Sequence, residues 1–223
     1  MIGFFNAFTK VTGWLVQKIC FRTKIYYEDK AVQGRRIKGS AIIVSNHTSV
    51  FDYAVFLFVF WNRTLRYQMA EVLFKKKLLA LFLRCMGGIY VDRGSHDFSF
   101  MAKCEDILKG GGVVGVFPEG RIPKAGEERP LEFQIGASQL ALESGAPIIP
   151  IYTNGSYFNK NRAKVVIGKP IYPGELIDEQ NDYKTNLQIV TAELRNKIIE
   201  LGNSIEETVK DEKQQEKEEL SLL

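Results

Sequence analysis

Cysteine is scarce in this 223-residue sequence, and the three present are Cys20, Cys85 and Cys104. Their odd number and irregular spacing argue against a disulfide framework and against a cysteine-based metal site. We therefore expect buried thiols in a reducing compartment, and no metal site.

Long apolar runs are also missing. The apolar stretch at residues 53–61 is far shorter than the ~20 residues that a membrane-spanning helix needs, and Arg63 and Arg66 follow it. The N-terminus has no small-residue cleavage site behind an apolar core, so we expect no signal peptide. A soluble or peripheral protein is the class that remains.

The charge is only mildly basic, with a formal net charge of +4 and a sequence pI of about 8.8. Because no arginine-aromatic recognition pattern accompanies it, we expect no nucleic-acid partner. This charge fits an anionic surface or an anionic substrate equally well. The 45% hydrophobic content allows one full core with room for an appended element.

Apolar runs alternate with helical periodicities through the middle of the chain. Strands are predicted at residues 41–44, 65–70, 89–91, 113–117, 147–152 and 164–167, and an edge strand within 24–38. Helices are predicted at residues 50–61, 75–86, 97–109 and 133–144. Several strands are apolar throughout, which indicates an α/β fold: a mixed, largely parallel sheet covered by helices on both faces.

The N-terminal segment has the pattern of an amphipathic helix. Its apolar stripe is Phe4, Phe8, Val11, Leu15 and Ile19, and its polar side is Asn6, Lys10, Gly13 and Gln17. The stripe could pack on the core, or it could lie in a membrane interface, which the aromatic content and the position favour. Three lysines at 75–77 allow a similar choice between a solvated helix end and contact with anionic lipid.

Three segments follow from these patterns. Residues 1–37 are expected to form a membrane-association element, and residues 38–205 a catalytic domain. A charged tail at 206–223 lacks aromatic residues, which predicts a solvated, frayed helix or a disordered segment.

His47 and Asp52 are candidates for a general base and its orienting carboxylate. Imidazole titrates near neutrality, and a carboxylate on its far nitrogen fixes the tautomer. Five residues of separation place the two side chains about 140° apart on one ideal helix. A turn carrying His47 that leads into a helix carrying Asp52 would bring them together. The structural alternative is a histidine that caps the strand–helix junction.

A second polar cluster follows the predicted strand at 113–117. There Glu119 could orient an arginine or bind a substrate hydroxyl, and Gly120 permits close backbone approach. Arg121 offers a forked donor for phosphate, and Arg93 could supply another. No serine lies in a Gly-x-Ser-x-Gly turn, which favours direct attack by a substrate hydroxyl over a covalent intermediate.

Four blocks in register give the chain a resemblance to the glycerolipid acyltransferases, the 1-acylglycerol-3-phosphate acyltransferase family. They are Asn-His-Thr-Ser-Val-Phe-Asp at 46–52, the block ending in Asp-Arg at 87–93, Phe-Pro-Glu-Gly-Arg at 117–121 and the apolar proline block at 146–151. The similarity covers roughly residues 38–170. One difference is that Arg121 follows Gly120 directly, where the family usually has Thr or Ser between them.

The resemblance implies transfer of a fatty acyl chain from acyl-CoA or acyl carrier protein to the hydroxyl of 1-acylglycerol 3-phosphate, giving phosphatidic acid. His47 and Asp52 would be catalytic, and Arg93, Glu119, Gly120 and Arg121 would bind the acceptor. No metal or other cofactor is implied, and the enzyme would work as a peripheral protein at the cytoplasmic face of the membrane. Alternatives are another acceptor, such as glycerol 3-phosphate or a different lysophospholipid, a hydrolase, or a lipid-binding protein without turnover.

Overall fold

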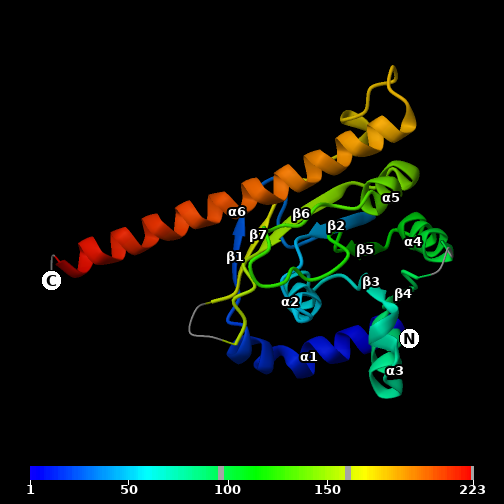
Figure 1. Ribbon diagram of the computed structural model, residues 1–223. Helices are drawn as coiled ribbons and strands as arrows, with labels where there is room; N and C mark the ends of the chain where they lie inside the picture. The colour runs from blue at the N-terminus through cyan, green and yellow to red at the C-terminus, as the bar shows by residue number, and fades with distance from the viewer. Residues whose placement is uncertain (95–97, 159–161, 222–223) are drawn as a thin grey trace.

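A seven-stranded sheet organises the structure, a computed structural model that describes residues 1–94, 98–158 and 162–221 (Figure 1). The strand order is β1-β7-β6-β2-β5-β3-β4. The strands are β1 Lys24–Tyr27, β2 Ala41–Ser45, β3 Leu65–Ala70, β4 Ile89–Val91, β5 Val113–Val116, β6 Ile148–Thr153 and β7 Lys164–Ile167. All neighbours are parallel except β6 and β7. The prediction of a mixed, largely parallel sheet is therefore confirmed.

Helices cover both faces of this sheet (Figure 1). They are α1 Ile2–Cys20, α2 Asp52–Val59, α3 Lys77–Met86, α4 Ser99–Lys109, α5 Gly136–Ser144 and α6 Tyr183–Ser221, with 3-10 turns η1 Glu71–Phe74 and η2 Pro173–Glu175. Within β2, Ile43 packs in the core cluster that includes α2, whereas Ile42 and Val44 pack in the cluster of α4, α5 and α6. Burial on both faces explains why this strand is apolar throughout.

Two elements connect segments that the sequence analysis separated. Strand β1 pairs with β7 at the edge of the sheet, so the sheet begins at Lys24, well before residue 38. Helix α6 continues through residue 205 to Ser221, which agrees with a helix rather than a disordered tail, and Figure 1 shows its C-terminal part running beyond the sheet. The predicted start of α4 at residue 97 lies outside the described residues.

Helix α1 turns its polar side toward the protein. Asn6 is buried and its Nδ2 donates to the carbonyl of Met86, at the end of α3, over 2.9 Å. Lys10 Nζ donates to three carbonyls just beyond α2, over 3.3, 3.0 and 2.6 Å. A cation is favourable at a helix C-terminus, although burial lowers the pKa of Lys10 to about 8. Polar contacts at two helix ends therefore dock α1.

The apolar stripe of α1 consequently faces outward. The exposed fractions are 79% for Phe4, 55% for Phe8, 78% for Val11, 60% for Leu15 and 65% for Ile19. The structure thus excludes the alternative in which this stripe packs on the core. Within the described residues, none of the helices combines the length and hydrophobicity needed to span a bilayer.

Candidate active site

The candidate residues lie at the carboxyl ends of the parallel strands. His47 follows β2, Arg93 follows β4, and Glu119 follows β5. Strands β2, β5, β3 and β4 run in one direction, so their carboxyl ends meet on one side. Ligands of α/β sheets bind on this side, outside the carboxyl ends of the strands.

His47 and Asp52 are paired by a hydrogen bond of 2.8 Å between His47 Nδ1 and Asp52 Oδ2. Asp52 is the first residue of α2, and His47 lies in the preceding loop. The same Oδ2 accepts from the N–H groups of Thr48 and Ser49 over 2.7 and 2.9 Å. The turn therefore wraps around the carboxylate and brings the ring to it, as the five-residue spacing requires.

An aromatic contact also fixes the orientation of the His47 ring. It stacks on Phe117 with ring centroids 4.1 Å apart and an interplanar angle of 12°. The carboxyl of Asp52 is fully buried, whereas the side chain of His47 is 18% exposed. With the Nδ1 proton donated to Asp52, Nε2 is left as the basic nitrogen that a substrate can reach.

Glu119 occupies a different position from the one expected from the sequence. It is buried, and its Oε1 accepts from the N–H of His47 over 2.6 Å while its Oε2 accepts from the N–H of Leu131 over 2.8 Å. Burial raises the pKa of this carboxyl, against the opposing effect of the two backbone bonds. Glu119 thus clamps the backbone behind His47 instead of orienting an arginine.

Replacing Glu119 by glutamine is expected to lower the free energy of unfolding by ~1–3 kcal/mol, because the new amide group would face a buried N–H donor. Acyl transfer should fall as well, since the backbone of His47 loses its anchor. Denaturant unfolding and turnover measure the two effects. The exposed neighbour Glu128, changed to glutamine, is the matched control and should leave both unchanged. Wild-type stability in Glu119→Gln would show that this clamp is unimportant.

The two arginines already hold carboxylates at the surface. Arg93 donates from Nη1 to the carbonyl of Gly120 over 2.6 Å and lies 3.5 Å from Glu71. Arg121 forms a two-point contact with Glu127 over 2.7 and 2.8 Å. This contact, together with a backbone N–H, lowers the pKa of Glu127 to about 2. Both guanidinium groups are about half exposed, within reach of a ligand.

Gly120 has a steric reason to be glycine. Its φ is +69°, and a Cβ at this position would lie 2.7 Å from Nε2 of Gln134. A side chain would therefore strain the turn that presents Arg121.

A cavity of about 650 Å³ joins these groups. His47, Arg93, Gly120 and Arg121 all line it, and Glu119 does not. Its apolar walls come mainly from α2 and the loop before it, from β3, η1, α3 and from the strand ends: Val50, Tyr53, Met69, Val72, Leu73, Leu79, Leu83, Val91, Phe100, Val116 and Ile122. A basic rim beside a deep apolar wall suits an anionic amphiphile.

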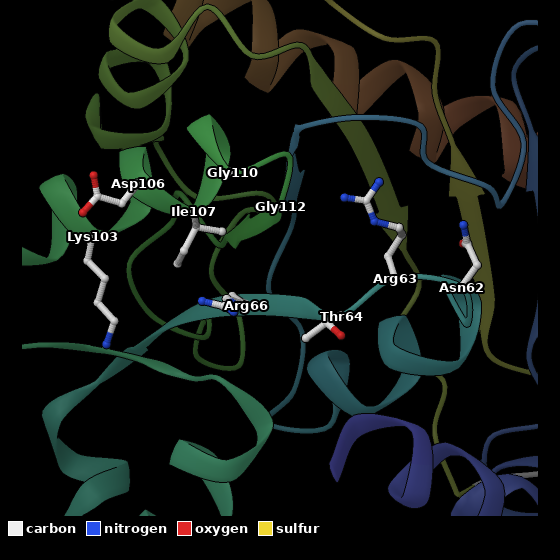
Figure 2. Close-up of a pocket in the computed structure, with 9 residues that line it drawn as sticks. All are labelled: Asn62, Arg63, Thr64, Arg66, Lys103, Asp106, Ile107, Gly110 and Gly112. Atoms are coloured by element: carbon white, nitrogen blue, oxygen red, sulfur yellow. The ribbon is translucent and has the colours of Figure 1, made fainter. Parts of the chain in front are cut away.

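A second cavity, of about 580 Å³, lies where β3 and β5 begin (Figure 2). Its labelled side chains come from the loop before β3, from β3 and from α4 with the turn that follows. Arg63 there donates to the carbonyls of Ile37, Gly39 and Gly111, so it fastens loops together. None of the predicted site residues lines this cavity. Among the described residues, no cluster of His, Cys, Asp or Glu could hold a metal ion.

The fold and this site define an α/β protein with a histidine–aspartate pair beside a basic, apolar-walled cavity. A sequence model described as "Acyltransferase" matches residues 22–154, more than half of the chain. The chain therefore belongs to the acyltransferase family, as its four motif blocks indicated, and is an O-acyltransferase by class.

Among curated relatives, the chain is 28% identical over 148 residues to the 1-acyl-sn-glycerol-3-phosphate acyltransferase of Bacillus subtilis, covering 64% of this chain and 71% of that protein. It is 30% identical over 133 residues to the enzyme of the same name from Borreliella burgdorferi, covering 56% of this chain and 50% of that protein. The crystal structure of the 1-acyl-sn-glycerophosphate acyltransferase PlsC from Thermotoga maritima matches with a TM-score of 0.58 at 20% identity, covering 87% of this chain and 78% of the other. That last similarity shows the fold.

Proposed function

We propose that the chain transfers a fatty acyl group from acyl-CoA or acyl carrier protein to the free hydroxyl of 1-acylglycerol 3-phosphate, giving phosphatidic acid. The observation that carries this proposal is that His47, two arginines and a long apolar wall all line the same cavity. Relatives with this activity in their names add support.

In this mechanism His47 is the general base. Its Nε2 takes the proton of the acceptor hydroxyl as the oxygen attacks the thioester carbonyl, forming a tetrahedral intermediate. Asp52 stabilises the imidazolium that forms and keeps the ring oriented. When the intermediate collapses, the carbon–sulfur bond breaks and the imidazolium returns the proton to the thiolate, so His47 ends each cycle neutral.

The acceptor phosphate would be bound by Arg93 and Arg121. Exposed ion pairs such as those with Glu71 and Glu127 contribute little, typically ~0–1 kcal/mol. A phosphate dianion can therefore replace a carboxylate partner at small cost and engage the same forked donors. Gly120 lets the backbone approach the ligand, and the apolar wall would take an acyl chain.

We also propose that the enzyme sits peripherally on the cytoplasmic face of the membrane, where the acyl donors are found. The outward stripe of α1 supports this placement. Beside it, α3 exposes Leu78 and Leu81 at 82% and 60%, and the rings of Phe5 and Phe82 meet edge-on at 5.8 Å. In Figure 1, α1 and α3 lie together on the side of the sheet away from α6. Leu79 and Leu83 of α3 line the cavity, so lipid would reach it directly.

A thiol-release assay tests the proposed activity. Purified protein and acyl-CoA are incubated with lysophosphatidate, glycerol 3-phosphate or other lysophospholipids, and free thiol and the acylated product are measured. The largest rate is expected with lysophosphatidate. Faster reaction with another acceptor would reassign the substrate. Thiol release without any acceptor would indicate a hydrolase, and lysolipid binding without thiol release would indicate a lipid-binding protein.

A further inference from the structure

The second carboxylate oxygen of Asp52 accepts one hydrogen bond from inside the motif around His47 and one from outside it. Oδ1 accepts from the hydroxyl of Tyr157 over 2.6 Å and from Oγ1 of Thr48 over 2.7 Å. Tyr157 lies 105 residues after Asp52, in the loop that follows β6. It belongs to none of the four motif blocks.

The direction of the hydrogen bond from Tyr157 is set by its surroundings. Burial, together with the charge of Asp52, raises the pKa of the Tyr157 phenol far above its usual value. The phenol therefore stays protonated and donates to the carboxylate. Its oxygen also lies 3.0 Å from Oγ1 of Thr153. Because the phenol proton is already given to Asp52, Thr153 is the donor in that second bond.

The loop that carries Tyr157 is fastened from two sides. Asn46, next to His47, pairs with the backbone of Thr153 through two hydrogen bonds of 2.8 Å. On the other side the ring of Tyr157 meets that of Phe21 edge-on at 5.5 Å, just after α1 ends. The phenol is thus held at a fixed place relative to Asp52, as a positioning role requires.

We propose that Tyr157 is a positioning residue for acyl transfer, acting on His47 through Asp52. Its hydroxyl fixes the carboxylate and draws negative charge toward Oδ1, away from the oxygen that holds the imidazole. Hydrogen bonds to a carboxylate stabilise its charged form. Asp52 can then orient His47 without binding the imidazolium so tightly that the base stays protonated. This inference rests on the proposed function of the His47–Asp52 pair.

Among the residues that the structure describes, other titratable or charged groups also lie around the pair, and Arg93 and Arg121 share a cavity with His47. Glu119 holds the backbone of His47, and the phenols of Tyr53 and Tyr67 pack under the cavity from α2 and β3. Burial raises the pKa of both phenols well above the usual range, so they stay neutral throughout an assay. With one acceptor used for every variant, a difference between variants near neutral pH is therefore assigned to His47 with its carboxylate neighbours.

The test is Tyr157→Phe, which keeps the ring on Phe21 and removes only the hydroxyl. We expect kcat to fall roughly 10-fold, less than the ~10²–10⁴-fold contribution of the base itself because His47 and Asp52 both remain, with KM for acyl-CoA nearly unchanged. The acid limb of the pH–rate profile should move to higher pH by about half a unit or more, because Oδ2 then holds the imidazolium more strongly. Tyr183→Phe is the matched control, since its hydroxyl also meets a carboxylate, Glu143, at 3.2 Å on the surface.

NMR titration gives a readout that a purely structural role would not move. The chain has two histidines, so the ring signals of His47 can be assigned by their loss in His47→Ala. Their titration midpoint should rise in Tyr157→Phe and stay unchanged in Tyr183→Phe. A normal rate with an unmoved midpoint would overturn the inference. Thr153→Val, which removes the donor to the phenol, should shift the midpoint in the same direction and replaces Tyr157→Phe as the test if that variant does not fold.

The double variant separates this inference from the proposed function. In a His47→Ala background, Tyr157→Phe should have no further effect on the rate if it acts through the pair. An equal loss in both backgrounds would contradict the inference and leave the base role intact. A nearly normal rate in His47→Ala alone would instead contradict the proposed function.

Discussion

Replacing His47 with alanine is expected to lower the rate of acyl transfer about 10²–10⁴-fold, the usual contribution of a positioned general base. The substitution removes the nitrogen that would accept the hydroxyl proton, whereas the arginines and the apolar wall stay in place. The measurement is thiol release from acyl-CoA at saturating acceptor, followed over a pH series. Binding of the lysolipid should change little, so the loss belongs in kcat.

Two controls make the His47→Ala result specific. Because the ring is only 18% exposed and stacks on Phe117, unfolding curves must show that the variant is folded. Cys85→Ser, on α3 and outside the cavity lining, provides a variant that should keep the wild-type rate. Turnover of His47→Ala within a few-fold of wild type would remove the base from the mechanism, and another group would have to accept the proton.

The pairing of His47 with Asp52 could be predicted because its determinants are local. A buried strand, a short turn and a helix start lie within a dozen residues, and the spacing excludes a single helix. The sheet was predictable for a similar reason, since strands buried on both faces, such as β2, must be apolar throughout. In both cases the residue pattern that is visible in the sequence is the one that the packing requires.

The remaining features depend on contacts that have no local signal. Tyr157 reaches Asp52 only because β6 lies beside β2 in the sheet. The role of Phe117 could have been suspected, since it opens the motif that contains Glu119, but stacking on His47 requires that β5 also lie beside β2. For Glu119, its place in the motif suggested contact with an arginine or a substrate hydroxyl. In the structure it is buried and accepts from two backbone N–H groups instead.

Helix α1 shows a different limit of sequence patterns. Its periodicity revealed two faces, but the amphipathic pattern does not say which face the protein takes. The orientation is decided by Asn6 and Lys10, which donate to a carbonyl at the end of α3 and to carbonyls just beyond α2. These acceptors exist only once the helices have assembled. The consequence is an apolar stripe that faces solvent in the absence of a membrane.

Introducing glutamates at Val11 and Leu15 is expected to release the enzyme from membranes. Both side chains are well exposed, at 78% and 60%, so the fold should persist. Burying an aliphatic side chain contributes ~1.5–3 kcal/mol, and losing two would weaken binding about 100-fold or more. Co-sedimentation with vesicles of anionic phospholipid measures the effect. Deleting residues 1–20, which should also move the protein to the soluble fraction, would remove the contacts of Asn6 and Lys10 as well, so the point variants are cleaner.

The matched control adds the same charges at the same helical spacing on α6, as Gln188→Glu with Ala192→Glu. Both positions are exposed, and α6 lies on the opposite face of the sheet from α1 (Figure 1). This control should still bind vesicles. A short-chain, water-soluble acceptor should be acylated at similar rates by both variants, because neither change reaches His47. If the α1 variant still bound vesicles, the exposed stripe would have to serve another partner. If both variants lost binding, the loss would be due to the added negative charge and not to the apolar stripe.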